Sequence, residues 1–217
     1  EPTLTAFFAS QNGCSYQMSV KDRDFINDMI SFNWDVSEND SEYDSLWTLL
    51  NDENNTIWQE FIEYDEINEK NYVVSRIVQV KYEGFNNTGD DIHIIPPTIE
   101  DVDSLKFMYL SDNNLENIPA EIGNLLRLKY LHLDHNEIQS IPESIGGSQG
   151  LKKLEHLILN DNQIDSVSSF LSNLISLTEL DLSRNSLETL PSSLCAFSQV
   201  IKIIGNQFEC GCVEWDE

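Results

Sequence analysis

One pattern of aliphatic and asparagine residues recurs four times in the second half of the chain, between Leu105 and Leu190. Each copy follows the pattern L-x-x-L-x-L-x-x-N-x-L, in which L stands for an aliphatic residue and x for any residue. The copies begin at Leu105, Leu128, Leu154 and Leu177, so the starts are 23, 26 and 23 residues apart. A fixed period of this length is typical of a solenoid, in which each repeat contacts only its neighbours.

The alternating part of each copy predicts a short strand, because its aliphatic residues all point to one side of the backbone. One such strand cannot bury its apolar side alone, so we expect successive copies to stack into a parallel sheet over a continuous core. The Asn follows the strand, where a buried turn leaves backbone donors and acceptors unpaired. Because an amide side chain offers both kinds of partner, we predict a ladder of Asn113, Asn136, Asn162 and Asn185.

This pattern resembles the leucine-rich repeat family, and the resemblance covers more than half of the chain. The segment IPAEIGNL, from Ile118 to Leu125, is similar to the convex side of bacterial and plant-like 23-residue repeats. The resemblance implies an α/β solenoid shaped as a horseshoe, with a short parallel β-sheet on its concave face. We place about six copies in residues 77–208.

The first and last of these copies are degenerate, as terminal repeats tend to be. Ile77, Val80 and Tyr82 take the strand positions of the first copy, and Ile201, Ile203 and Asn206 follow the pattern in the last. The glycine-rich stretch 146–150 lengthens the second regular copy by three residues. We interpret it as a loop on the convex side, where insertions leave the strand stack intact.

Residues 1–76 are assigned to a leader followed by a helical N-terminal cap, since the first repeat would otherwise expose its core. Apolar residues at helical spacing predict helices around Phe25–Ile30, Tyr43–Leu50 and Trp58–Ile62. A cofactor pocket built from Trp47 and Trp58 is the alternative interpretation. Aromatic residues at this spacing are usually core, so we expect no cofactor.

The C-terminal segment GNQFECGC, from Gly205 to Cys212, resembles the start of the cysteine-containing cap of extracellular leucine-rich repeat proteins. We therefore assign residues 209–217 to a partial C-terminal cap, and the pairing of Cys14, Cys195, Cys210 and Cys212 stays open. N-x-S/T sequons stand at Asn39, Asn54 and Asn86. Together these features favour a secreted or cell-surface protein, and oxidised cysteines in native material would support that location.

The charge of the chain excludes several kinds of partner. Twelve Lys and Arg stand against 38 Asp and Glu, for a formal net charge of −26. Binding to nucleic acid needs a basic surface, so we expect no nucleic-acid partner. No apolar run approaches the about 18 residues of a membrane span, so we expect no membrane insertion. An acidic surface without any partner is the plain alternative to attraction of basic ones.

No catalytic motif stands out, and we predict a non-enzymatic recognition module that binds a protein, or a glycan, through its concave face. Strand residues that alternate with the buried aliphatics should face that side. Exposed aromatic residues gathered on one face are typical of binding interfaces. The candidate partner-binding residues are Phe107, Tyr109, Tyr130, His132, His135, His156, Ile158, Glu179, Asp181 and Arg184.

Three alternatives remain beside this prediction. The first is an intracellular leucine-rich repeat scaffold that regulates a signalling protein. The second is a zinc or nickel site made by His132, His135 and His156 with Asp134 or Asp161; we predict no metal, because side chains in open columns rarely converge without supporting groups. The third is a concave face that binds nothing in particular. Protonation of the same histidines would make any binding pH-sensitive, and the oligomeric state is left open.

Overall fold

A single sheet runs through the computed structural model, which describes residues 7–9, 15–18, 20–34, 56–65, 70–82, 91–197 and 200–208. Within these residues the strand order is β1-β2-β4-β5-β6-β7-β8-β9, and β3 pairs with β4 off this path. The strands are β1 (Phe7–Ala9), β2 (Ser15–Met18), β3 (Thr56–Asp65), β4 (Lys70–Lys81), β5 (Phe107–Tyr109), β6 (Tyr130–His132), β7 (His156–Ile158), β8 (Glu179–Asp181) and β9 (Ile201–Lys202).

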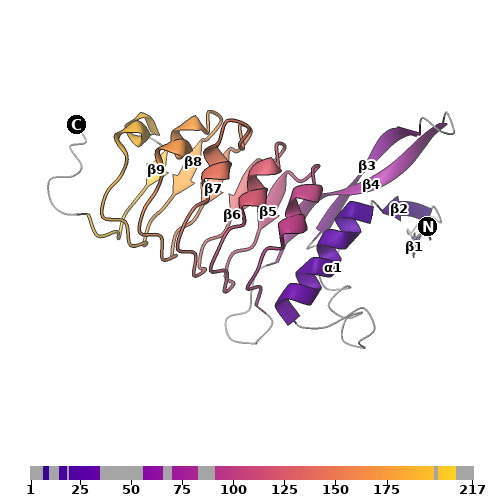
Figure 1. The fold of residues 1–217 in the computed structure, drawn as a ribbon, viewed down its shortest axis with the longest axis horizontal. Coiled ribbons are helices and arrows are strands. Elements are labelled where there is room, and N and C mark those ends of the chain that lie inside the picture. The colour runs from indigo at the N-terminus through magenta and orange to yellow at the C-terminus, as the bar shows by residue number, and fades with distance from the viewer. Residues whose placement is uncertain are drawn as a thin grey trace.

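The strands from β4 to β9 form a parallel sheet in which each strand is one repeat further along the chain (Figure 1). Pairing is in register at the repeat period, so that Met108 lies opposite Leu131 and Leu157 opposite Leu180. This arrangement confirms the predicted leucine-rich repeat solenoid. The degenerate first copy belongs to the same sheet, because Val80 of β4 lies opposite Met108 of β5.

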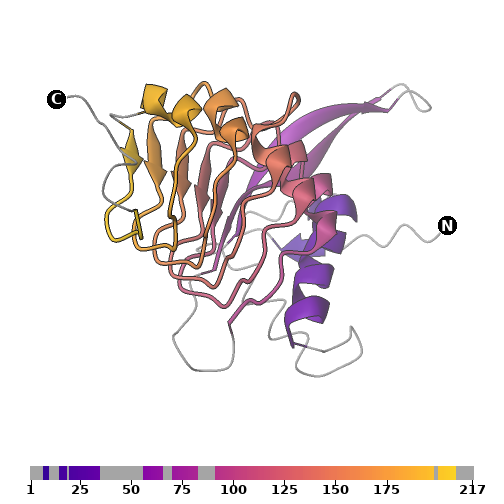
Figure 2. The ribbon, with the colours of Figure 1, turned by 60° about the vertical axis from the view of Figure 1, so that its left-hand side comes forward.

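Short 3-10 helices form the opposite side of the solenoid (Figure 2). Pro96, Pro119 and Pro142 stand immediately before three of them, where a fixed φ near −67° suits the turn into the helix. In the fourth, Ser168 takes the proline's place, and its hydroxyl accepts a hydrogen bond from the Phe170 N–H. The helices are η1 (Pro97–Asp101), η2 (Ala120–Asn124), η3 (Glu143–Gly146), η4 (Ser169–Asn173) and η5 (Ser192–Phe197).

The glycine-rich insertion lies directly after η3, as predicted for a convex loop. A Cβ on Gly146 would stand 2.0 Å from the carbonyl oxygen of Phe170 in the next repeat. The close approach of η3 to η4 therefore depends on the missing side chain at this position.

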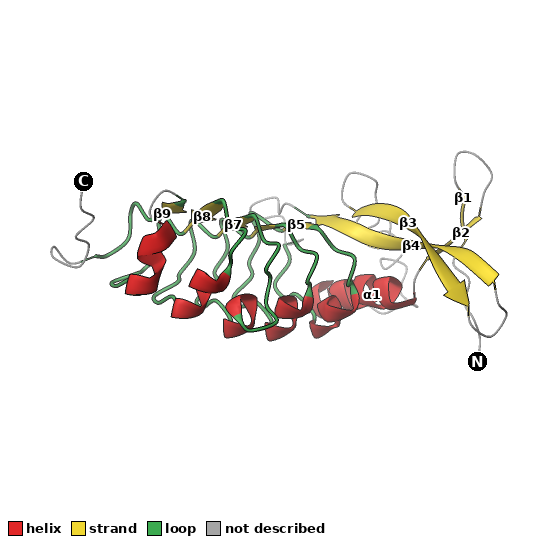
Figure 3. Cartoon of the chain, turned by 90° about the horizontal axis from the view of Figure 1, so that it is seen from above, coloured by secondary structure: helices red, strands yellow, loops and turns green. Residues whose placement is uncertain are grey.

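The core fills the space between the sheet and the 3-10 helices (Figure 3). The middle residue of every strand from β5 to β8 is fully buried, with its two neighbours half-buried on the other side of the sheet. Fully or almost fully buried aliphatic residues such as Leu105, Leu133, Ile164 and Leu187 extend this core along the whole stack. The side of the sheet that faces away from the core therefore takes no part in covering these apolar residues.

Asparagine side chains close the turn that follows each strand. The Oδ1 atom of Asn162 accepts a hydrogen bond of 2.9 Å from the N–H of Ile138 in the preceding repeat. Its Nδ2 atom donates to the carbonyls of Leu133, 2.9 Å away, and Leu159, 3.1 Å away. Equivalent bonds are made by Asn113, Asn136, Asn185 and Asn206.

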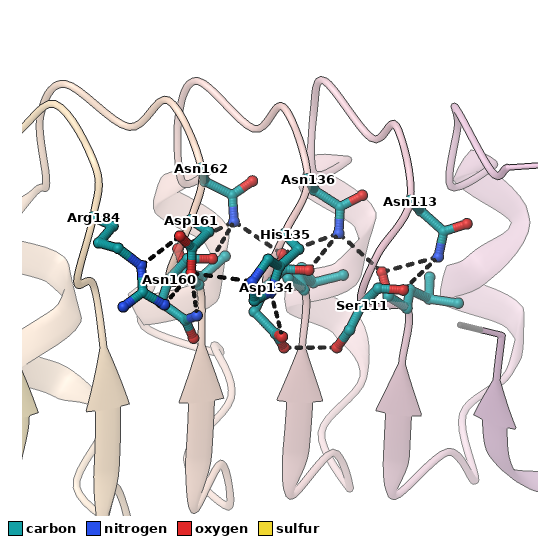
Figure 4. Close-up of polar contacts among 12 residues, drawn as sticks. Ser111, Asn113, Asp134, His135, Asn136, Asn160, Asp161, Asn162 and Arg184 are labelled. Atoms are coloured by element: carbon teal, nitrogen blue, oxygen red, sulfur yellow. Dashed lines mark hydrogen bonds and ion pairs between the residues drawn. The ribbon is translucent and has the colours of Figure 1, made fainter. Parts of the chain in front are cut away.

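The predicted ladder is confirmed, and the last copy belongs to it through Asn206. Figure 4 shows Asn113, Asn136 and Asn162 in the same position of successive repeats. Each amide bonds to backbone atoms of two repeats. When the repeats stack, the ladder therefore pairs backbone groups that would otherwise be buried without a partner.

We predict that Asn162→Ala lowers the free energy of unfolding by about 2–4 kcal/mol, since it leaves a buried N–H and two carbonyls without their partner. Urea denaturation followed by circular dichroism would measure the change. Asn117→Ala, at an exposed position, serves as the control and should change stability by less than about 0.5 kcal/mol. Equal losses from both variants would show that the ladder is not what stabilises the stack.

The N-terminal cap is only partly helical, which corrects one sequence prediction. The helix expected around Phe25–Ile30 is present as α1 (Val20–Trp34), but the segment predicted as a helix around Trp58–Ile62 is strand β3. β3 pairs antiparallel along β4, with Thr56 opposite Val80. The first strand of the repeat sheet, β4, is therefore paired with β3 on the side away from β5.

The error has a physical reason. Apolar residues at positions 57, 58, 61 and 62 fit helical spacing, but β-branched and aromatic residues also favour strands, and the long strand β4 offers a template beside them. The expected helix at Tyr43–Leu50, the cysteines Cys14, Cys210 and Cys212, and the three sequons lie outside the described residues. The division of the chain at residues 76 and 208 stays a prediction.

Helix α1 packs next to η1 and continues the row of 3-10 helices beyond the first repeat (Figure 1). Its buried residues include Phe25, Ile26 and Met29. Two side-chain bonds join it to η1: Lys21 Nζ lies 2.6 Å from Asp101 Oδ1, and the Thr98 hydroxyl donates to Asp28 over 2.7 Å. At its first turn the buried carboxylate of Asp22 accepts a hydrogen bond of 2.8 Å from the Ile77 N–H of β4.

We expect Asp22→Ala to destabilise the protein by about 1–3 kcal/mol, because the buried Ile77 N–H loses its acceptor. Asp22→Asn keeps an oxygen that can accept the same bond and should recover most of that loss. Thermal unfolding of the three proteins at one pH would measure the effect. If the alanine and asparagine variants are equally unstable, the hydrogen bond to Ile77 is not the reason for burying this side chain.

Candidate functional site on the concave face

Two columns of side chains stand on the side of the sheet that faces away from the core. Each column is set by strand register, since residues directly opposite in parallel strands point the same way. Apart from the exposed Lys202, these side chains are half-exposed. One column holds Gln79, Phe107, Tyr130, His156 and Glu179, and the other holds Lys81, Tyr109, His132, Ile158, Asp181 and Lys202.

The rings of five of these residues touch one another, and we call this group the aromatic surface: Phe107, Tyr109, Tyr130, His132 and His156. Tyr130 lies at its centre, with its ring centroid 5.3 Å from Phe107 in an edge-on contact and 4.4 Å from His156. The ring of Tyr109 meets that of His132 edge-on at 4.9 Å. Edge-on ring contacts fix the positions of the side chains, so the surface is preformed.

Beyond the aromatic surface the columns become charged. His156 Nδ1 lies 3.1 Å from Glu179 Oε2, and Lys202 Nζ lies 2.5 Å from Glu179 Oε1 and 3.7 Å from Asp181 Oδ2. The hydrogen bond from Lys202 lowers the pKa of Glu179, against the opposing effect of burial. These charged groups contact one another within the protein, so the concave face has an aromatic half and a half with ion pairs between its own residues.

His132 is partly enclosed within the aromatic surface. Its Nε2 atom is buried, with no hydrogen-bond partner among the described residues. Burial lowers the pKa of His132 below its ordinary value, and the nearby Asp134 opposes this only in part. The ring is therefore neutral at pH 7 and adds no charge to the surface around it.

The residues just past the strands form a third row. Asp112, His135, Asp161 and Arg184 all have left-handed backbone conformations, with φ between 51° and 56°, and Gly205 has the same handedness in the last repeat. Such conformations are uncommon outside glycine and strain the backbone. The repeat turn imposes them here, because they recur at one position of five successive copies.

Side chains of this row join neighbouring repeats (Figure 4). The guanidinium of Arg184 forms a two-pronged ion pair with Asp161, and His135 Nε2 lies 3.4 Å from the same carboxylate. His135 Nδ1 lies 3.1 Å from Asp134, which also accepts a 2.6 Å bond from the Ser111 hydroxyl. The hydrogen bond from Arg184 is the main reason why the pKa of Asp161 falls to about 2.

The metal alternative does not fit this geometry. The rings of His132 and His156 are inclined by 26° with centroids 6.3 Å apart, while His135 points into the ion pairs of the third row. Among the described residues no group of three His, Cys, Asp or Glu side chains is placed to hold a metal ion. The three histidines therefore belong to two different surroundings.

The sequence predicted the strand columns but not the side chains that bind the residues of the third row. Register alone indicated that Tyr130 and His156 are neighbours, because they occupy one position of successive repeats. Ser111 was not singled out, and Asp134 was named only as an alternative metal ligand, although both precede a residue of the third row by one position. A comparison of the charges in these two positions would have suggested ion pairs between repeats.

We predict that the carboxyl group of Asp161 titrates at about pH 2 and that Arg184→Gln moves it up towards the ordinary value of about 4. A depressed pKa in the folded state stabilises the protein above about pH 4, and that contribution disappears as the pH falls through about 2. Carbon-13 NMR of the carboxyl groups would follow the titration. An unchanged pKa in the variant would contradict the ion pair.

Comparisons with known proteins give the same picture. The family model for the leucine-rich repeat matches residues 103–164 and 127–187. The ectodomain of the receptor kinase SOBIR1 from Arabidopsis thaliana superposes with a TM-score of 0.67 over 89% of this chain and 97% of that one. At 20% identity this similarity establishes the fold alone. No curated protein sequence matches this chain significantly.

Two further structures are closer in sequence. A chain of the BIR3–SERK2 complex from Arabidopsis thaliana is 32% identical with a TM-score of 0.51, over 63% of this chain and 74% of that one. A leucine-rich repeat protein of Leptospira interrogans is 29% identical with a TM-score of 0.51, over 55% of this chain but only 30% of its own. No helix in the described part of the chain is long and apolar enough to cross a membrane. From its repeats, its fold and these matches, the chain belongs to the leucine-rich repeat family.

Proposed function

We propose that this chain is a non-enzymatic recognition module that binds a protein partner through its concave face. The observation that carries the proposal is the aromatic surface, which combines five touching rings with half-exposed side chains. The core lies on the other side of the sheet, so folding does not require aromatic residues in these columns. Tyr and Trp side chains dominate the energetics of many protein interfaces.

The rigidity of the aromatic surface also supports a role in binding. The strands are fixed by in-register pairing, and the rings are fixed by contacts with each other. Binding to a preformed surface costs less conformational entropy than binding that must first order its side chains. Ile158 extends the apolar area by one position, since it lies opposite His132.

The charged residues have a different role in the proposal. Glu179, Asp181 and Arg184 are occupied by partners within the protein. Exposed ion pairs contribute little to affinity but favour some partners over others. We therefore assign the main contact to the aromatic surface and selectivity to Glu179, Asp181, His135 and Arg184.

A cell-surface or secreted location goes with this proposal, and an intracellular scaffold is its alternative. The BIR3–SERK2 complex, one chain of which is similar to this one, supports a module that contacts other proteins. A glycan partner would also use aromatic residues. The protein partner is preferred because one of the similar structures is a complex of two proteins.

Affinity capture from cell-surface and secreted extracts would test the proposal, with native protein compared to Tyr130→Ala. Tyr130 contacts both Phe107 and His156, so its loss opens the centre of the aromatic surface. We expect capture to weaken about tenfold or more, as for residues at the centre of an interface.

The matched control is Phe170→Ala, which removes a partly exposed ring from η4 on the convex side and should leave capture unchanged. Circular dichroism would verify that both variants fold. A partner retained by Tyr130→Ala and lost by Phe170→Ala would place recognition on the convex side and overturn the proposal.

A further inference from the structure

The short segments that lead into strands β5, β6 and β7 carry an excess of positive charge. These segments are residues 103–106, 126–129 and 152–155. They contain five of the chain's twelve Lys and Arg residues and two acidic residues, Asp103 and Glu155. The local charge is therefore +3, on a chain whose formal net charge is −26. We call the five positive residues the basic edge: Lys106, Arg127, Lys129, Lys152 and Lys153.

The register of the sheet places the three segments side by side. The Lys129 N–H donates to the Lys106 carbonyl over 2.8 Å, and the Glu155 N–H donates to the Lys129 carbonyl over 2.7 Å. Arg127 and Lys153 each stand three residues before a strand, and both are exposed. Because neighbouring strands lie about 4.8 Å apart, the basic edge is one row along the starts of the strands.

Contacts within the protein leave part of this charge uncompensated. Lys129 Nζ lies 2.5 Å from Glu155 Oε1, so these two charges form an ion pair. The ammonium group of Lys152 donates instead to two main-chain carbonyl oxygens, 3.1 Å and 3.3 Å away, which have no net charge. Among the residues that the structure describes, Lys153 makes no hydrogen bond or ion pair. Positive charge therefore remains for a ligand at β7.

The basic edge and the aromatic surface occupy the same three repeats. Phe107 and Tyr130 directly follow Lys106 and Lys129 in the chain, and none of the four is buried. The equivalent positions before β8 hold no charged residue: Ile175, Ser176 and Thr178. The positive row thus ends at β7, the strand that carries the last ring of the aromatic surface, His156.

The opposite ends of these strands carry the opposite charge. Residues 110–116, 133–139 and 159–165, which follow β5, β6 and β7, contain six acidic residues and no Lys or Arg. Figure 4 shows Asp134 and Asp161 at the arrowhead ends of their strands. Arg184 of the next repeat binds Asp161 there. The aromatic surface therefore has a positive row at one side and mainly carboxylates at the other, which favours one orientation of a charged partner.

We propose that the concave face binds an acidic segment of its protein partner, with the partner's carboxylates on the basic edge and its apolar side chains on the aromatic surface. The inference rests on the proposed function and specifies the chemistry of the partner. Hydrogen bonds from guanidinium and ammonium groups to carboxylates are about twice as strong as neutral ones. Repulsion from the rest of the acidic chain acts over longer distances, and salt screens it beyond about 8 Å at physiological ionic strength.

The probe is a fluorescent glycine–serine peptide of about eight residues that contains two phenylalanines followed by three glutamates. A second peptide has glutamine in place of glutamate, which has nearly the same shape and no charge. Fluorescence anisotropy with the full chain would compare their affinities at physiological salt. We expect the glutamate peptide to bind at least about fivefold more tightly, through more than one exposed ion pair. A net charge of −26 alone predicts the reverse order.

Variants of the protein separate the basic edge from other positive charges. Lys153→Gln and Lys202→Gln each remove one exposed lysine, but Lys202 lies on β9, outside the basic edge. We expect Lys153→Gln to weaken binding of the glutamate peptide about threefold, and its combination with Arg127→Gln about tenfold. Lys202→Gln should leave it within about 1.5-fold. Binding of the glutamine peptide should be the same for all variants, and circular dichroism would verify that they fold.

The two proposals fail in different ways. Equal binding of the two peptides, tighter binding of the glutamine peptide, no binding of either, or equal losses from Lys153→Gln and Lys202→Gln would overturn the inference of an acidic segment. If the captured partner is still lost on Tyr130→Ala in those cases, the proposed function stands. A partner that is retained by Tyr130→Ala, while the glutamate peptide binds as expected, would overturn the proposed function and leave the basic edge as a binding site.

Discussion

The structure depends on pairing the buried backbone groups at the turn after each strand. A strand of three residues cannot reach the next repeat without a turn, and that turn leaves N–H and C=O groups in the core. The asparagine amide has an acceptor oxygen and a separate NH2 donor on one short side chain, so Asn136 and Asn162 each bind backbone atoms in two repeats. With the turns satisfied, the aliphatic residues can stack into one core, and the sheet presents its other side to solvent.

Because the core lies on one side of the sheet, the other side, which is the concave face, is available for recognition. Side chains at the alternating strand positions contribute little to burial, so they can be chosen for contact with a partner. In this chain the type of concave side chain differs along the stack. Rings that touch each other lie on β5 to β7, and paired charges lie on β7 to β9. The left-handed row at Asp112, His135, Asp161 and Arg184 adds a polar border whose positions are set by the repeat turn.

Most of the repeat region was predictable, because the period fixes which residues are buried and which are neighbours. The pairs Phe107–Tyr130 and Tyr130–His156 follow from register alone. The N-terminal cap was predicted less well. Helical and strand patterns overlap around Trp58–Ile62, and the long-range partner β4 decided between them. For the histidines, column position gave nearness without convergence: His135 turns to Asp134 and Asp161, while His132 and His156 remain on the aromatic surface.

The central claim is that partners contact the sheet side of the solenoid. Site-specific photocrosslinking tests it most directly, with a benzophenone amino acid placed at Phe107 in one protein and at Phe170 in another. The two positions are rings on opposite sides, one on β5 and one on η4. The structure predicts a covalent adduct with the captured partner from position 107 and none from position 170. An adduct from position 170 alone would contradict recognition by the concave face.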